Sequence, residues 1–136
     1  MLQRIQTIWL LLAGIAILLT LKFTSLVVET ADLKYAEQNG LNSGVAITIV
    51  TVLIGLLSFV IIGLYKNRVL QLRLCVVGII LELVLLFLYY KKATEFTNHS
   101  INIMAILHVL VIILFVLAAR GINSDEKLIK QSDRLR

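Results

Sequence analysis

The segment VAITIVTVLIGLLSFVIIGLY, from Val45 to Tyr65, is 21 residues long and contains no charged side chain. A helix needs about 20 mostly apolar residues to cross the hydrocarbon core of a lipid bilayer. Because lipid offers no hydrogen bonds to the backbone, such a segment is expected to be a membrane-spanning α-helix. The composition agrees, since 60% of the residues are hydrophobic and 15% are charged. The sequence therefore predicts an integral membrane protein.

Three further apolar runs have a comparable length, at residues 5–26, 72–90 and 101–119. Lys22 lies within the first of them and Glu82 within the second, but both runs are long enough to cross a bilayer. We therefore expect an all-α integral membrane protein, a four-transmembrane-helix bundle in a single domain over residues 1–136. Residues 120–136 are expected to form a short cytoplasmic tail helix with Ser124, a residue type favoured at this position, as its N-cap.

The Lys and Arg residues are divided unevenly between the two sides that four spans create. Nine of the 13 lie on the side of the two termini, and four lie on the opposite side. Because cytoplasmic segments of membrane proteins carry the excess of Lys and Arg, both termini are expected in the cytoplasm. The chain has a net charge of +5, but its basic residues lie on both sides of the membrane, and the cytoplasmic ones lie where topology requires them. Lipid head groups are therefore the expected counter-ions, and no nucleic-acid partner is expected.

The segment between the first two runs is expected on the outer side of the membrane. Residues 29–38, ETADLKYAEQ, are predicted to form a short helix with Thr30 or Asp32 as its N-cap. Residues 39–44, NGLNSG, form a cluster of turn-favouring residues that is expected to precede the second helix.

Glu82 is an acidic residue within the apolar stretch CVVGIILELVLLFLYY, Cys75 to Tyr90. Each residue of a helix rises about 1.5 Å, so Glu82 lies about 12 Å below the outer boundary at Tyr90. By the same measure His108 lies about 10 Å below Ile101, on a helix that enters from the same side. Because ionisable residues in spans face the bundle interior and one another, we predict a Glu82–His108 pair.

Two roles for this pair are open. It fixes the register of two helices as a buried polar contact, or it handles protons or contacts a cation within a larger assembly. A metal site is not expected, because one His and one Glu provide too few ligands. Lys22 is expected to extend its side chain outward to the head groups.

A small and polar stripe follows one face of the second run: Thr48, Thr51, Gly55 and Ser58. Such a face allows close helix packing and hydrogen bonds between helices. On the third run Cys75 and Gly78 share a face with Glu82, and the lone Cys75 is expected to be a buried structural thiol. We expect these residues to face the interior of the bundle.

The sequence contains no Walker A, GxGxxG, CxxC or HExxH motif. No nucleophile and base share a spacing typical of covalent catalysis. We therefore expect a non-enzymatic protein that uses no cofactor.

The last residues, GINSDEKLIKQSDRLR, place acidic residues before basic ones. This order suits a helix, because Asp125 and Glu126 fall near its positive N-terminal end. Two interpretations are open for this tail. It is an amphipathic helix on anionic head groups, or it is a docking segment for a cytoplasmic protein.

The opening MLQRIQTIWLLLA and the ending AARGINSDEKLIKQSDRLR resemble an uncharacterised four-span membrane family of Bacteroidota, known as domain of unknown function 4293. The resemblance implies a bacterial inner-membrane protein with both termini inside, and it implies no activity. The residues to which it points all lie on the cytoplasmic side: Arg4, Gln6, Asp125, Glu126, Lys127, Asp133, Arg134 and Arg136.

The sequence thus favours an accessory or assembly subunit of the inner membrane that acts through its cytoplasmic tail. Its expected partners are the lipid bilayer and either another protein or further copies of this chain. The alternative is a small proton-coupled transporter or channel element that uses Glu82 and His108. Such an element needs to oligomerise, because four short spans enclose little volume.

Overall fold

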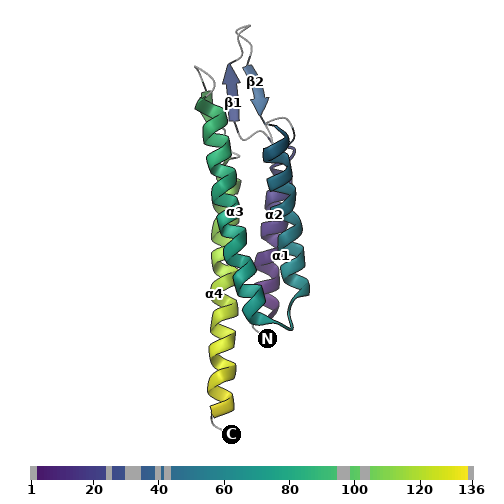
Figure 1. Cartoon of the computed structure of the whole chain (residues 1–136), viewed down its shortest axis with the longest axis vertical. Helices are drawn as coiled ribbons and strands as arrows, with labels where there is room; N and C mark the ends of the chain where they lie inside the picture. Colours follow the sequence, from purple (N-terminus) through teal and green to yellow (C-terminus); the bar gives the residue numbers. More distant parts are fainter. Residues whose placement is uncertain are drawn as a thin grey trace.

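The computed structural model describes residues 3–23, 26–29, 35–38, 41, 44–94, 99–101 and 105–134. Within these residues the chain forms four helices: α1 (Gln3–Leu19), α2 (Val45–Gly63), α3 (Arg68–Thr94) and α4 (Ile106–Arg134). Each helix packs against two neighbours, so that α1 contacts α2 and α4, and α3 contacts the same two helices. Both chain ends lie at one end of this bundle, which we call the termini end (Figure 1). The predicted set of four helices is confirmed.

The surface of the bundle is suited to lipid. Helices α2 and α3, and residues Ile106–Leu128 of α4, are each long and apolar enough to cross a membrane. Large apolar side chains face outward, among them Leu56 and Phe87, which are 57% and 63% exposed. A continuous apolar surface of this kind is unfavourable in water. The structure is therefore that of a membrane-spanning protein, in which α1 contributes a shorter apolar segment, Ile5–Leu19.

The buried positions of all four helices recur at alternating spacings of four and three residues. They include Gln6, Leu10, Ala13, Ile17 and Thr20 at α1; Ile47, Thr51, Ile54, Ser58 and Ile61 in α2; Gln71, Cys75, Gly78, Glu82, Leu85 and Tyr89 in α3; and His108, Val111, Phe115, Ala118, Ile122 and Asp125 in α4. A seven-residue repeat keeps one seam of each helix toward its partners, as in a coiled coil. Every seam carries polar residues among the apolar ones.

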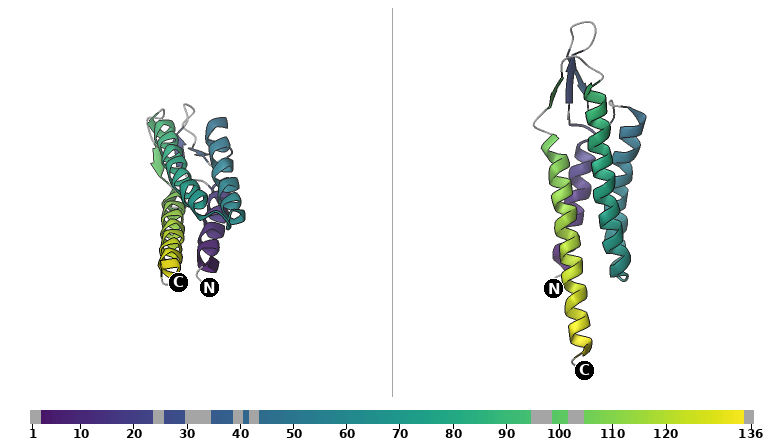
Figure 2. Two further views of the ribbon diagram at one scale, coloured as in Figure 1. Left: turned by 60° about the horizontal axis from the view of Figure 1, so that its bottom comes forward. Right: turned by 60° about the vertical axis from the view of Figure 1, so that its left-hand side comes forward.

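A three-stranded antiparallel sheet lies at the end of the bundle opposite the termini, in the order β2-β1-β3 (Figure 2). The strands are β1 (Leu26–Glu29), β2 (Tyr35–Gln38) and β3 (His99–Ile101). The predicted helix over residues 29–38 is therefore wrong, and its proposed caps, Thr30 and Asp32, lie outside the described residues. An isolated helix of this length is marginal in water, whereas Val27 and Val28 favour a strand that can pair on both edges.

The sheet also shifts two helix boundaries. The first run was expected to continue to Leu26, but α1 ends at Leu19 and a turn leads to Phe23, whose backbone N–H donates to the Leu19 carbonyl at 3.0 Å. The fourth run was expected to begin at Ile101, but this residue pairs with Leu26 in the sheet. Strand pairing satisfies the backbone groups of these residues, so they leave the helices.

Two turn residues begin the central helices. Gly44 precedes α2 with φ of 130°, a conformation that residues with a Cβ rarely adopt, in line with the turn expected before this helix. Asn67 precedes α3, and its Oδ1 accepts a hydrogen bond from the Leu70 backbone N–H at 3.2 Å. This cap satisfies one of the backbone N–H groups in the first turn of α3.

Helix α4 continues without interruption through the tail to Arg134. The prediction of a separate tail helix that begins at Ser124 is therefore wrong, because Ser124 lies inside α4. Extending an existing helix fixes one residue for each new hydrogen bond, whereas starting another requires a new nucleus. No proline interrupts the segment, so elongation is favoured.

Candidate functional site

Glu82 and His108 meet in the interior of the bundle, between α3 and α4. The distance from His108 Nδ1 to Glu82 Oε1 is 2.7 Å, and the two side chains are 1% and 0% exposed. The two helices run antiparallel as neighbours, which brings residues of equal depth together. The structure thus joins the pair that residue depth alone predicted.

The surroundings of this pair are aromatic and tightly packed. The Tyr89 ring lies against the His108 ring, with centroids 5.2 Å apart and planes tilted by 54°. One turn before Glu82, a Cβ at Gly78 would lie 2.8 Å from the Phe115 ring. Glycine at this position therefore allows α3 and α4 to approach closely enough for the hydrogen bond.

The contact requires one proton, held either by the imidazole or by the carboxyl group. Both arrangements satisfy Oε1, while Glu82 Oε2 is buried and has no hydrogen-bond partner among the described residues. A buried acceptor without a partner is unusual in a settled polar lock. A further group or a water molecule that reached Oε2 would give the pair a route for proton exchange.

The small and polar stripe on α2 faces the bundle but does not join this pair. Thr51 and Ser58 are buried, and their hydroxyls donate to Ile47 and Gly55 carbonyls of their own helix at 2.7 Å each. These two hydroxyls were expected to bond to other helices, but the hydrogen bonds that they donate stay within α2. Ser and Thr in apolar helices commonly bond to the preceding turn in this way.

The stripe instead provides close packing against α1, as its small residues indicated. A Cβ at Gly55 would lie 3.0 Å from Leu18, and one at Gly14 would lie 2.5 Å from the Ser58 hydroxyl. Thr48, the first residue of the stripe, is half-buried and bonds to the Gly44 carbonyl at 3.1 Å. Cys75 is buried on α3, as expected of a structural thiol, and Lys22 is exposed.

A second buried polar pair joins α1 to the beginning of the tail. Gln6 Nε2 donates a hydrogen bond to Asp125 Oδ2 at 2.6 Å, and both side chains are almost fully buried. Gly121, one turn before Asp125, lies against this glutamine, since a Cβ there would be 2.8 Å from Gln6 Cγ. We call this contact the Gln6–Asp125 clamp.

The remaining tail residues that the sequence singled out lie beyond the clamp. Lys127 is exposed and Glu126 is half-buried. The backbone of Asp133 and Arg134 belongs to the last turn of α4. Arg136 lies outside the described residues. Leu128, a large apolar side chain in this part of α4, is 51% exposed. We call residues 126–134 the arm, and Figure 1 shows that α4 extends past the rest of the bundle here.

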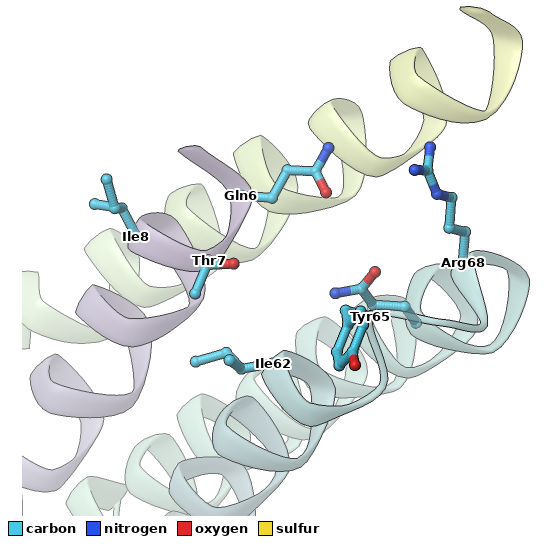
Figure 3. A pocket seen from close by; sticks show the side chains of 7 residues that line it. Gln6, Thr7, Ile8, Ile62, Tyr65 and Arg68 are labelled. Atoms are coloured by element: carbon cyan, nitrogen blue, oxygen red, sulfur yellow. The ribbon is translucent and has the colours of Figure 1, made fainter. Parts of the chain in front are cut away.

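A cavity of about 480 Å³ opens at the termini end, between α1 and the turn that connects α2 to α3. It is lined by Gln6, Thr7, Ile8, Ile62, Tyr65, Arg68 and Gln71. Figure 3 shows Gln6 and Thr7 on one side of this space and Tyr65 and Arg68 on the other. Gln71 Nε2 donates to the Ile61 carbonyl at 3.1 Å and so fixes the cavity wall.

The sequence patterns did not predict that Gln6 contacts Asp125. They also gave no structural role to three residues of these sites: Gln71, Gly121 and Tyr89. The signal for the clamp is present in the seven-residue repeat. Asp125 follows His108 at a spacing that keeps both on one seam of α4, and Gln6 opens the seam of α1. If the seven-residue repeat of buried positions is continued beyond the apolar run that ends at residue 119, it predicts that Asp125 is buried on the same seam as His108.

The family model for the domain of unknown function DUF4293 matches residues 2–135. No curated protein and no solved structure was found to match the chain. The family match covers both polar pairs, the cavity and the arm, but it assigns no activity to any of them.

Proposed function

We propose that this chain, which belongs to the DUF4293 family, is a non-enzymatic accessory or assembly subunit that presents the arm to a partner protein. In this proposal the bundle spans the bacterial inner membrane four times, with both termini in the cytoplasm. The basic residues Lys66, Arg68 and Arg120 at the termini end support this orientation, because cytoplasmic ends carry the excess of positive charge.

The observation that carries the proposal is the unbroken passage of α4 from the buried core into the arm. Ile122 is fully buried in the bundle, and Asp125 is held by Gln6 at 2.6 Å. From this clamp the arm continues as helix to Arg134. A docking element that is already ordered loses less conformational entropy when it binds, so a clamped helix is suited to recognition.

The direction of the arm supports docking over the alternative in which the tail lies on head groups. An interfacial helix lies in the plane of the membrane with its apolar face in the lipid. Here the arm follows the direction of α4 and extends beyond the bundle (Figure 2). With the bundle upright in the bilayer, the arm projects into the cytoplasm, where Lys127, Leu128 and Gln131 are exposed to a partner.

Co-purification from the native membrane tests this proposal. The full chain is compared with a truncated chain that lacks residues 129–136 and keeps the clamp. We expect one partner protein to be recovered with the full chain and lost with the truncated one.

Charge reversal provides a matched pair of variants. Lys127→Glu changes an exposed residue of the arm, and Lys66→Glu changes an exposed residue in the turn between α2 and α3 at the same end. We expect only the first to weaken recovery of the partner. Equal recovery with the truncated and full chains, or equal loss with the two charge variants, contradicts the proposal.

A second candidate function rests on the Glu82–His108 pair. Its motivation is the buried Glu82 Oε2, which has no partner among the described residues and which leaves room for proton exchange with a further group. We infer that, if the chain assembles into oligomers, this pair lies on a proton path. Proton flux into vesicles that contain the purified protein tests this candidate, and flux unchanged by Glu82→Gln excludes it.

A further inference from the structure

The cavity at the termini end combines groups that are rarely brought together for packing alone. The lining residues Ile8 and Ile62 are apolar, whereas Thr7, Tyr65 and Arg68 supply donors. Tyr65 is 59% exposed, and Ile8 is 54% exposed on the lipid-facing surface of α1. The lining thus combines apolar side chains, one of them exposed on the surface of the bundle, with hydrogen-bond donors.

The position of Arg68 is unfavourable for helix stability. It is the first residue of α3, where the positive end of the helix dipole favours an acidic side chain, and the first turn contains none. The structure records no ion pair for Arg68 among the residues that it describes. Within the part of the chain that the structure describes, no acidic partner therefore offsets the charge of Arg68.

Neighbouring charges leave the cavity electropositive. Lys66 lies next to it, with Nζ 6.0 Å from the Tyr65 ring centroid. No carboxylate is among the residues that line the cavity, and the Asp125 carboxylate accepts its hydrogen bond from Gln6. An anion in the cavity would face Arg68, the first residue of α3, and the Tyr65 hydroxyl.

The volume and location select the class of anion. A cavity of about 480 Å³ is large enough for a small polar group, and binding sites for small molecules span about 300–1,000 Å³. Basic pockets between helices at a membrane boundary bind the head groups of anionic lipids. A phosphodiester with attached acyl chains suits both sides of this cavity, since its chains can follow Ile8 and Ile62 into the lipid.

We propose that this cavity binds the phosphate head group of an anionic phospholipid, with Arg68 as the principal charged contact. The head group lies between α1 and the α2–α3 turn, beside the glutamine of the clamp. Because Gln6 both lines the cavity and holds Asp125, a bound lipid supports the base of the arm.

The only tryptophan of the chain, Trp9, follows the cavity-lining Ile8 and serves as the reporter. The purified full chain is placed in phosphatidylcholine vesicles that contain a minor fraction of a lipid with brominated acyl chains. Quenching of Trp9 fluorescence by brominated phosphatidylglycerol is compared with quenching by brominated phosphatidylcholine. We expect phosphatidylglycerol to be preferred about fivefold, the ratio that corresponds to one basic contact near the membrane surface.

Two charge variants on the same helix separate a site from general attraction. Arg68→Gln removes the proposed contact, and Arg73→Gln removes an exposed charge that does not line the cavity. We expect the first to abolish the lipid preference and the second to keep at least half of it. Tyr65→Phe, which removes one hydroxyl, is expected to reduce the preference without changing the helix content.

Three results overturn the proposal. One is equal quenching of the unaltered chain by the two brominated lipids. Another is an equal loss of preference in the Arg68→Gln and Arg73→Gln variants. The third distinguishes the source of the phosphate: if inorganic phosphate in the buffer removes the preference at constant ionic strength, the cavity binds free phosphate in place of a lipid.

Discussion

Helix α4 makes two buried polar contacts that differ in chemistry and in location. Glu82 and His108 join it to α3 deep in the bundle, and Gln6 and Asp125 join it to α1 at the termini end. Both acidic residues are preceded, one turn earlier, by a glycine in close contact with the neighbouring helix. The same local arrangement therefore supports an ionisable pair in one place and an amide–carboxylate pair in the other.

The difference indicates what each contact does. In the deep pair both side chains are of ionisable types, and one carboxyl oxygen has no partner among the described residues, so the stability of the contact depends on where a proton is held. In the Gln6–Asp125 clamp only Asp125 is of an ionisable type, and the Gln6 amide donates a hydrogen bond to it directly. The deep pair is thus suited to a polar lock or a proton site, and the clamp is suited to holding the arm.

The largest effect is expected when one member of the deep pair is removed. Glu82→Leu removes the hydrogen bond between the Glu82 carboxyl and the buried His108 imidazole, and we expect a loss of about 3 kcal/mol in the free energy of unfolding. The double variant Glu82→Leu/His108→Leu is expected to recover most of this loss, because two apolar side chains then pack together. Unfolding in mixed micelles measures both. A double variant as unstable as the sum of the single ones contradicts this view of the pair.

The cost of adding a methyl group is compared next at the two glycines that precede the buried acidic residues, Gly78 and Gly121. Gly78→Ala brings a methyl group against the Phe115 ring, and we expect a cost of about 2 kcal/mol. Gly121→Ala meets the flexible Gln6 side chain, and the higher helix propensity of Ala offsets about 1 kcal/mol of the strain. Gly63→Ala, with nothing within 4 Å of its added methyl, is the control. The same micelle experiment should therefore rank Gly78→Ala as the most destabilising, and a larger cost at Gly121 would reverse the comparison.

The clamp is expected to affect the arm more than the bundle. Asp125→Ala removes a hydrogen bond to a charged acceptor, with an expected cost of about 1.5 kcal/mol. Hydrogen exchange of the backbone amides in residues 126–134 should become faster, whereas that of α3 should not change. Asp125→Asn keeps an acceptor for Gln6 and is expected to show a smaller change. Unchanged exchange in the arm of the Asp125→Ala variant would show that the clamp does not hold it.

The smallest effect is expected in α2, an apolar helix whose small and polar stripe makes neither kind of pair. The Thr51 hydroxyl bonds to its own helix, so Thr51→Val is expected to change the free energy of unfolding by about 0.5 kcal/mol or less. The same micelle unfolding experiment measures it. A cost close to that of Asp125→Ala would mean that this hydroxyl contributes to contacts between helices.

The four helices and the deep pair follow from the sequence because their determinants are local. Apolar length predicts each helix, and counting residues from Tyr90 and from Ile101, the outer ends of two adjacent apolar runs, gives Glu82 and His108 the same depth. The small stripe on α2 likewise predicts close packing, and Gly55 lies against Leu18. Its hydrogen bonds were not predictable in the same way, because Thr51 and Ser58 can bond either to their own helix or to another.

The features that were missed depend on contacts between distant segments. Strand β1 pairs with β2 in its own connection and with β3 in the connection between α3 and α4, and neither pairing has a signal in a single apolar run. Ser124 resembles an N-cap, but Ile122 and Asp125 pack in register with the core, so α4 continues through it. The boundary drawn at residue 119 separated Asp125 from the repeat to which it belongs.

The direction of the arm is the central claim, and one measurement tests it. The chain is prepared in a Cys75→Ser background with Gln131→Cys, labelled with a nitroxide and placed in vesicles; Phe87→Cys, on the lipid-facing surface, serves as the reference. If the arm projects from the membrane, a water-soluble nickel complex relaxes the label at position 131 strongly, and oxygen relaxes it weakly. A label at position 131 that responds preferentially to oxygen, like the one at position 87, would place the arm on the bilayer and contradict its role as a docking element.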